Sequence, residues 1–283
     1  MSATAVPVPV TLIDIGANLA HDSFDQDRDA VLMRAAAAGV QQIVVTGSDL
    51  DSAHQAIVLA QQHRGRLFAT AGVHPHHAGS WNNDLRARFA DLAPLAEVVA
   101  LGECGLDYFR NFASHADQRR AFAAQLDLAI SAGKPLFLHQ RDAHADFHAM
   151  LREYRGALGA VVVHCFTDTR DALLDYLALD CHIGITGWIC DERRGTHLVE
   201  AVREIPRHRL LLETDAPYLL PRTAPKAVTA EHGRRNEPAL LPWVLRSVAA
   251  ARSESEDALA AQTTHNARAF FGLRAGVTQV LQQ

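Results

Sequence analysis

The sequence predicts an α/β fold, a single (β/α)8 barrel of the TIM type, and two observations carry this prediction. Eight short apolar, β-branched runs recur along the 283 residues, separated by segments in which apolar residues have helical spacing. A new run begins about every 30 residues, as expected when each unit holds one strand and one helix. Eight parallel units in a chain of this length match the usual size of a closed β/α barrel.

The expected strands are short, and most of them end in a polar residue. They span residues 11–14, 42–46, 67–73, 98–103, 135–139, 160–164, 182–186 and 209–215. The clearest helices between and after them span residues 25–38, 116–132, 240–252 and 254–271. Gly39 and Gly133 follow the first two of these helices, and glycine is the residue that most often ends a helix.

A doubly wound open sheet is the alternative fold. Its phosphate-binding turn would carry the pattern GxGxxG after the first strand, whereas this chain has Gly16, Ala17, Asn18 and Leu19 there. No linker or shift in composition divides the chain. We therefore expect one domain over residues 1–283, with a core from about 11 to 272 and short extensions at both ends.

Composition excludes several classes of protein. Hydrophobic residues make up 48% and charged residues 21%, as in ordinary globular proteins, so a disordered chain is excluded. A net charge of −5 excludes a uniformly basic coat protein for nucleic acid but leaves room for a local basic patch. With no secretory signal and no apolar run long enough for a membrane span, we expect a cytoplasmic protein that makes no membrane contact. The cysteines lack paired spacing, which favours reduced thiols: Cys104, Cys165, Cys181 and Cys190.

Acidic and histidine side chains stand at or just after the ends of most expected strands. In a β/α barrel these ends meet on one rim, where the active site lies. A single buried histidine is more often a hydrogen-bonded core residue than a metal ligand. Several converging carboxylates and imidazoles, however, would be unsatisfied without a cation, so together they predict a divalent metal site. The rim residues are Asp14, His74, Glu103, His139, His164 and Asp215.

Five segments contain polar residues of the rim, and a sixth follows the last expected strand: residues 14–19, 71–76, 102–107, 164–167, 212–219 and 234–238. These segments resemble the TatD family of metal-dependent deoxyribonucleases. The resemblance extends from about residue 12 to residue 271 and implies a barrel of the metal-dependent hydrolase kind. It also implies hydrolysis of phosphodiester bonds in single-stranded DNA and possibly RNA, by 3′-to-5′ exonuclease action, and a role in DNA repair.

The resemblance also implies the ligand set. The residues that we carry over from the family as metal ligands are Glu103, His139, His164 and Asp215. Many relatives carry a His-x-His pair on the first strand, where this chain has Gly16 and Asn18. We therefore expect one tightly held ion and leave a second ion open, bridged by Glu103 and recruited with the substrate.

The expected ion is Mg²⁺, with Mn²⁺ and Zn²⁺ as alternatives, because the site combines oxygen ligands with two imidazoles. Such an ion activates a water molecule for attack on the phosphate. Glu103 and Asp215 are the expected catalytic residues, Asp215 as acceptor of the water's proton. Asp14, Asn18 and Glu213 are expected to support the ligands from behind.

Substrate contacts require positive charge and flat side chains. The loops after the seventh and eighth strands of such barrels often hold phosphate, and unpaired bases stack on aromatic rings. Surface charge is the alternative explanation for each arginine, and core packing is the alternative for the phenylalanine. The expected substrate-binding residues are His74, His76, Arg141, Phe112, Arg222 and Arg235.

Two other functions remain open on the sequence alone. The same barrel supports a metal-dependent deacylase or amidohydrolase, although the missing His-x-His pair counts against the latter. A scaffold that only binds nucleic acid is the non-enzymatic alternative, but it would have no reason to keep four metal ligands. We expect a monomer with single-stranded DNA or RNA as its substrate.

Overall fold

The computed structural model describes residues 11–229 and 233–274. Eight strands form one sheet in the order β1 to β8, and every neighbouring pair is parallel. The sheet closes where Ala17, at the end of β1, pairs with Ala216 in the segment after β8. The strands are β1 Leu12–Ala17, β2 Val40–Val45, β3 Leu67–Ala71, β4 Val98–Asp107, β5 Leu136–Arg141, β6 Val161–Val163, β7 His182–Ile185 and β8 Leu210–Leu212.

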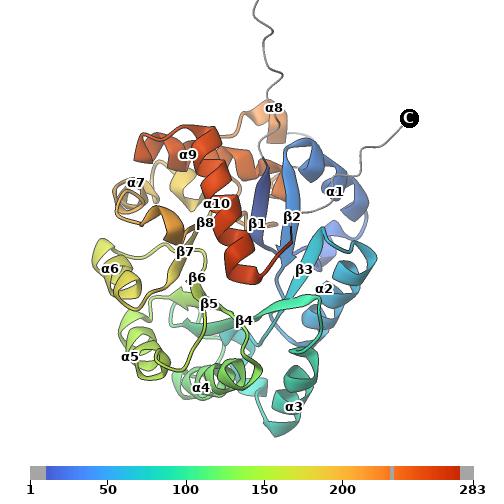
Figure 1. The fold of residues 1–283 in the computed structure, drawn as a ribbon, viewed down its shortest axis with the longest axis vertical. Helices are drawn as coiled ribbons and strands as arrows, with labels where there is room; N and C mark the ends of the chain where they lie inside the picture. Colours follow the sequence, from blue (N-terminus) through green and yellow to red (C-terminus); the bar gives the residue numbers. More distant parts are fainter. Residues whose placement is uncertain (1–10, 230–232, 275–283) are drawn as a thin grey trace, which may run out of the picture.

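Helices surround the strands, and α10 lies across one end of the barrel (Figure 1). They are α1 Arg28–Ala37, α2 Leu50–Gln62, α3 Asn83–Leu92, α4 His115–Ala132, α5 His144–Tyr154, α6 Arg170–Ala178, α7 Thr196–Ala201, α8 Lys226–Thr229, α9 Leu241–Arg252 and α10 Glu256–Phe271. Short 3-10 helices are η1 Asp22–Phe24, η2 Pro75–Ser80, η3 Gly187–Cys190, η4 Arg207–Arg209 and η6 Pro238–Leu240. The predicted barrel is therefore confirmed.

Local sequence explains where the long helices begin and end. The Ser114 hydroxyl accepts a hydrogen bond from the backbone N–H of Asp117 and caps α4. Gly133 follows that helix with φ +62°, a left-handed conformation that glycine adopts without strain. Ser255 and Gly272 have the same two roles at the ends of α10.

Apolar side chains fill the barrel interior below its mouth. Ile13, Ile15, Phe137 and Leu211 belong to this interior cluster, and Phe270 of α10 packs against them from the end where the strands begin. A second, larger cluster lies between the strands and the surrounding helices. The interior below the carboxyl ends of the strands is thus a packed core, which leaves only that mouth for chemistry.

Three strand ends, those of β1, β4 and β8, differ by three or four residues from the sequence-based expectation, and β4 runs on to Asp107. Strand β1 continues to Ala17, so Asp14 lies within the strand instead of on the rim. Its fully buried carboxylate accepts hydrogen bonds from the backbone N–H and the hydroxyl of Thr214, at 2.9 and 2.5 Å. Strand β8, by contrast, ends at Leu212, three residues before Asp215. The chain after β8 lies beside β1, since Asp215 N–H donates to the Gly16 oxygen at 2.8 Å and Asn18 N–H donates to the Ala216 oxygen at 2.7 Å.

The expected terminal extensions, residues 1–10 and 275–283, lie outside the described residues. Within the described part of the chain, none of the helices combines the length and the hydropathy that crossing a bilayer requires.

Candidate metal centre and active site

Three imidazoles converge on one carboxylate oxygen at the mouth of the barrel. Glu103 Oε1 lies 2.7 Å from Nε2 of His164, 3.0 Å from Nδ1 of His139 and 3.4 Å from Nε2 of His74. Glu103 belongs to β4 and His139 to β5, while His164 directly follows β6 and His74 lies three residues after the end of β3. Only 6% of the surface of Glu103 is exposed. Four consecutive units of the barrel therefore supply one buried cluster.

Two glycines allow β4 and β5 to approach closely enough to form this cluster. Gly102 has φ +129°, and a Cβ atom there would lie 2.1 Å from the backbone oxygen of Phe137. Gly105 has φ +145°, and a Cβ atom there would lie 1.9 Å from the backbone oxygen of His139. Any larger residue at either position would push β5 away and separate His139 from Glu103.

The donor set fits a divalent cation. Ligand atoms of His74, Glu103 and His139 all lie within 4.8 Å of one another. His139 Nε2 is buried, and among the described residues it has no hydrogen-bond partner; Asp107 Oδ2 is 3.4 Å away without hydrogen-bond geometry. A buried nitrogen without a partner beside two carboxylates is what a metal ion would satisfy.

The hydrogen bonds of His74 give it a different role from that of its neighbours. Its Nδ1 accepts the backbone N–H of His76 at 3.1 Å. Burial lowers the pKa of His74 to about 4, so the ring is neutral and its remaining proton is on Nε2. In this arrangement Nε2 carries its hydrogen toward the cluster, so His74 can donate a hydrogen bond there.

Glu213 supports His164 from the side away from Glu103. Its Oε2 lies 3.3 Å from Nδ1 of His164, and its Oε1 accepts the backbone N–H of Cys165. Two glycines make room for this fully buried carboxylate: a Cβ atom would lie 2.5 Å from Oε2 at Gly16 and 2.6 Å from Oε1 at Gly184. Glu213 therefore occupies the space beside Gly16. This glycine is at one of the two positions where many relatives carry the His-x-His pair.

Asp215 lies at the same mouth. Its Oδ1 accepts a hydrogen bond of 3.1 Å from the side-chain amide of Asn18. Burial raises the pKa of Asp215 to about 7, opposed by the nearby His164. Its backbone has φ +53°, and its N–H donates to the backbone oxygen of Gly16 at 2.8 Å. These contacts orient the carboxylate from the β1 side of the barrel.

Asp107 is a site residue that the sequence analysis missed. Its Oδ2 lies 2.8 Å from Nε2 of His76, and its Oδ1 accepts the backbone N–H groups of Phe109 and Arg110. Burial opposes ionisation, but the nearby imidazoles of His139 and His76 and the backbone N–H of Arg110 hold the pKa of Asp107 well below its usual range. The signal lay in the motif of residues 102–107, but the expected strand ended at Glu103.

The expected substrate-binding residues occupy different places. Phe112 is 70% exposed, and its ring centroid lies 4.7 Å from that of His76, at the edge of the cluster. The Arg141 guanidinium carbon lies 5.1 Å from the ring centroid of Phe109. Arg222 lies on the loop after β8, where it forms an exposed ion pair of 3.2 Å with Glu192.

Arg235 is not brought to the cluster. Its two terminal nitrogens lie 2.8 and 2.7 Å from the carboxylate oxygens of Asp27, and its guanidinium carbon lies 4.7 Å from the Phe24 ring centroid. Its side chain is 18% exposed. These partners connect the loop before η6 to the segment between η1 and α1, so a structural role accounts for its contacts.

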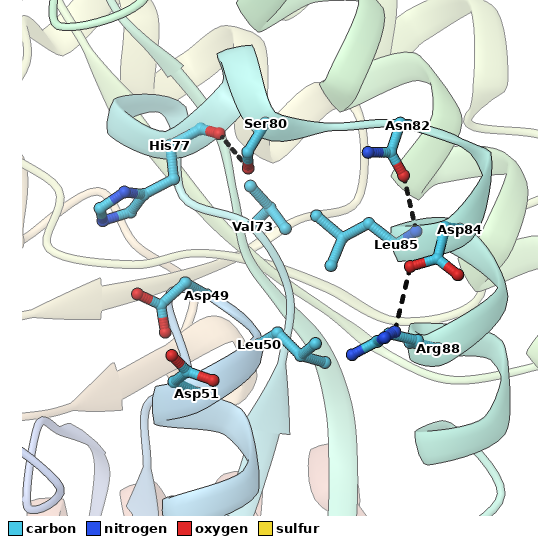
Figure 2. A pocket seen from close by; sticks show the side chains of 10 residues that line it. All are labelled: Asp49, Leu50, Asp51, Val73, His77, Ser80, Asn82, Asp84, Leu85 and Arg88. Atoms are coloured by element: carbon cyan, nitrogen blue, oxygen red, sulfur yellow. Dashed lines mark hydrogen bonds and ion pairs between the residues drawn. The ribbon is translucent and has the colours of Figure 1, made fainter.

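A separate cavity of about 470 Å³ lies outside the cluster, between the start of α2 and the η2–α3 segment (Figure 2). Its lining includes Asp49, Asp51 and Asp84, and Arg88 pairs with Asp84 at 3.1 Å. Asp49 also caps α2 through the backbone N–H of Ser52. This acidic lining does not suit a phosphodiester.

A parallel β/α barrel with two carboxylates and three imidazoles at its carboxyl end is the architecture of metal-dependent hydrolases. A family model described as "TatD related DNase" matches residues 13–272. The chain belongs to this family, as the sequence predicted, and is a hydrolase that acts on ester bonds.

Curated and solved relatives agree with this assignment. The 3′-5′ ssDNA/RNA exonuclease TatD of Pectobacterium parmentieri is 49% identical over 263 residues, which cover 93% of this chain and all of that protein. A TatD homologue from Escherichia coli superimposes with a TM-score of 0.85 at 27% identity, covering 94% of this chain and 100% of that one. A TatD family hydrolase from Entamoeba histolytica gives 0.83 at 25% identity, covering 93% and 99%. These relatives do not favour the deacylase, amidohydrolase or scaffold alternatives.

Proposed function

We propose that this protein is a metal-dependent 3′-to-5′ exonuclease for single-stranded DNA and RNA. The observation that carries the proposal is the convergence of three imidazoles on the buried carboxylate of Glu103 at the mouth of the barrel. The names of the relatives that are nearly 50% identical supply the substrate and the direction of cleavage.

The residues that would hold the ion are Glu103, His139, His164 and Asp215. Two carboxylates and two imidazoles accommodate Mg²⁺ best when water completes the coordination, with Mn²⁺ and Zn²⁺ as alternatives. When bound, such an ion polarises a phosphate oxygen and lowers the pKa of a water molecule. We propose one tight ion, with Glu103 as the bridge if a second ion arrives with the substrate.

The chain's own side chains perform the remaining steps. Asp215 receives the proton of the attacking water, and the amide of Asn18 holds its carboxylate in position. Glu213 keeps the proton of His164 on Nδ1, so that Nε2 faces the cluster. The Nε2–H group of His74 donates to a phosphate oxygen, where negative charge grows as the bond breaks.

Substrate contacts surround this centre. His76, held by Asp107, and the exposed Phe112 lie together on one side, where an unpaired base can stack on the phenyl ring. Arg141 and Arg222 offer positive charge for the backbone. The family motif predicts that Arg235 binds substrate, and this role stays a prediction. In the structure its guanidinium donates hydrogen bonds to Asp27 instead.

We also propose a cytoplasmic monomer that acts in DNA repair. The described cysteines, all unpaired thiols, support a reducing compartment. The repair role follows from the nuclease activity of the family.

Single-stranded DNA labelled at its 5′ end tests the proposal. The metal-stripped protein is incubated with this DNA with and without Mg²⁺ or Mn²⁺, beside His164→Ala and Asp215→Asn. We expect a ladder that shortens from the 3′ end only with metal, and no ladder from either variant. His54→Ala, which removes an exposed histidine of α2, is the matched control and should retain activity. A folded, metal-loaded protein that leaves DNA and RNA intact would refute the proposal.

A further inference from the structure

A second cavity lies on the side of β7 and β8 and is lined by residues that follow these two strands. It has a volume of about 270 Å³ and lies between η3 and the loop that follows β8. Its polar lining consists of three arginines and one aspartate, Arg194, Arg222, Arg234 and Asp191, and one wall is Trp188. This volume is at the small end of ligand sites, so it suits a phosphate group with part of its sugar.

The charge available to a ligand in this cavity is positive. Asp191 is 3% exposed, and its oxygens are occupied: Oδ1 accepts the backbone N–H groups of Arg193 and Arg194, and Oδ2 accepts Nε of Arg194. Among the described residues, the terminal nitrogens of Arg194 and the whole guanidinium of Arg234 have no hydrogen-bond partner. In the described part of the chain, the Arg222 guanidinium pairs with one carboxylate, that of the exposed Glu192. Several guanidinium donors therefore remain for an anion.

Trp188 connects the cavity to the metal centre. The Arg194 guanidinium carbon lies 4.5 Å from its ring centroid, and that of Arg141 lies 4.9 Å from it. Arg141 follows His139 by two residues on β5, so both side chains leave the strand on the same face. Since two guanidinium groups already lie over the Trp188 ring, the ring serves to orient arginines and is not a platform for a base.

We propose that this cavity binds the phosphate next to the scissile one, on its 5′ side, in a single-stranded substrate. The inference rests on the proposed exonuclease function. The nucleotide that a 3′-to-5′ exonuclease removes ends in a 3′-hydroxyl, so no further phosphate exists on that side. A second phosphate site must therefore hold the strand that remains. Because guanidinium groups contact the backbone and not the base edges, the site is independent of sequence.

The number of phosphates in the substrate tests this assignment. A thymidine dinucleotide has only the scissile phosphate, whereas the trinucleotide has one more on the 5′ side. We expect the wild type to have a kcat/KM about tenfold or more higher for the trinucleotide, as a charge-assisted phosphate contact supplies. In the double variant Arg222→Ala/Arg234→Ala this ratio should fall toward one.

Arg246→Ala is the matched control. Arg246 also lies 4.5 Å from a tryptophan ring centroid, that of Trp243, and forms a surface ion pair with Glu256 of α10. Its substitution should leave the ratio at the wild-type value. A wild type that cleaves both substrates equally well, or a double variant that keeps the preference, would overturn the proposal.

Binding in the presence of EDTA separates this inference from the proposed function. Without cleavage, fluorescence anisotropy of labelled dinucleotide and trinucleotide reports affinity alone. We expect tighter binding of the trinucleotide by the wild type and loss of that difference in the double variant; equal binding by the wild type would refute the second phosphate site. Failure of the metal-loaded wild type to cleave either substrate would instead refute the nuclease proposal.

Discussion

The substitution Glu213→Gln tests how the structure controls His164. It keeps the shape of the side chain but replaces one carboxylate oxygen with an NH2 group. Only the remaining oxygen can accept the backbone N–H of Cys165, so the NH2 group must face Nδ1 of His164. Nδ1 then has to accept a hydrogen bond, and the imidazole proton moves to Nε2, which faces Glu103 at 2.7 Å.

The magnitude follows from this change of tautomer. A protonated Nε2 cannot ligate a metal, and losing a supporting partner of a metal-bound histidine costs about 10–100-fold in metal affinity, or about 1.4–2.7 kcal/mol. The fold should lose only about 1 kcal/mol, because the hydrogen bond from Cys165 survives. The glutamine cannot move aside, since Gly16 and Gly184 lie against both of its terminal atoms.

Isothermal titration with Mn²⁺ measures the effect directly, and thermal unfolding of the metal-stripped protein measures the cost to the fold. Glu200→Gln, at an exposed position of α7, is the control and should bind Mn²⁺ as the wild type does. A folded Glu213→Gln protein with the metal affinity of the wild type would refute this account of His164.

Four further predictions concern stability, substrate binding and metal binding. Arg235→Ala should cost about 2 kcal/mol of unfolding free energy in urea, because it breaks a two-pronged ion pair; an unchanged stability with a raised KM would instead favour a substrate role. The hydrogen bonds from Arg235 lower the pKa of Asp27 to about 2, so its contribution is complete above about pH 4 and is lost as pH falls toward 2. Asp27→Asn should therefore remove about 1 kcal/mol at pH 7, and less at pH 3, in the same urea assay; a loss that does not depend on pH would contradict the ion pair. Phe112→Ala should raise KM for single-stranded DNA by an amount equivalent to about 1–3 kcal/mol with no change in Tm, since the ring is 70% exposed; an unchanged KM would exclude stacking. Mn²⁺ should raise the Tm of the wild type but not that of Glu103→Gln, as only the former binds the ion tightly; equal shifts would place the ion elsewhere.

The barrel was predictable because its signal is local. Each strand and helix is defined by apolar spacing within about 15 residues, and the strand ends follow from the same pattern. The strand ends were harder to predict from the sequence where closure of the sheet lengthens or shortens a strand. Strand β4 runs on to Asp107, and for that reason the partner of His76 escaped the sequence analysis.

The candidate ligands were also predictable, since motifs identify residue types at strand ends. Their individual roles were not, because a role depends on which atoms meet. Ligand atoms of His74, Glu103 and His139 lie close enough together to share one metal ion. Nδ1 of His74, however, accepts a hydrogen bond from the backbone N–H of His76, so a proton on Nε2, and not a lone pair, points into the cluster. No spacing in the sequence encodes that tautomer.

The sequence by itself determined the fold class, the family and the rim on which the chemistry takes place, because these depend on periodicity and on motifs within short segments. Tertiary structure alone decided that Glu103 is the carboxylate around which the imidazoles gather, that Glu213 fills the space left at Gly16, and that Arg235 pairs with Asp27. These contacts join residues that are 29 to 208 positions apart. Such pairs meet only when the barrel closes, and packing and burial then select each partner.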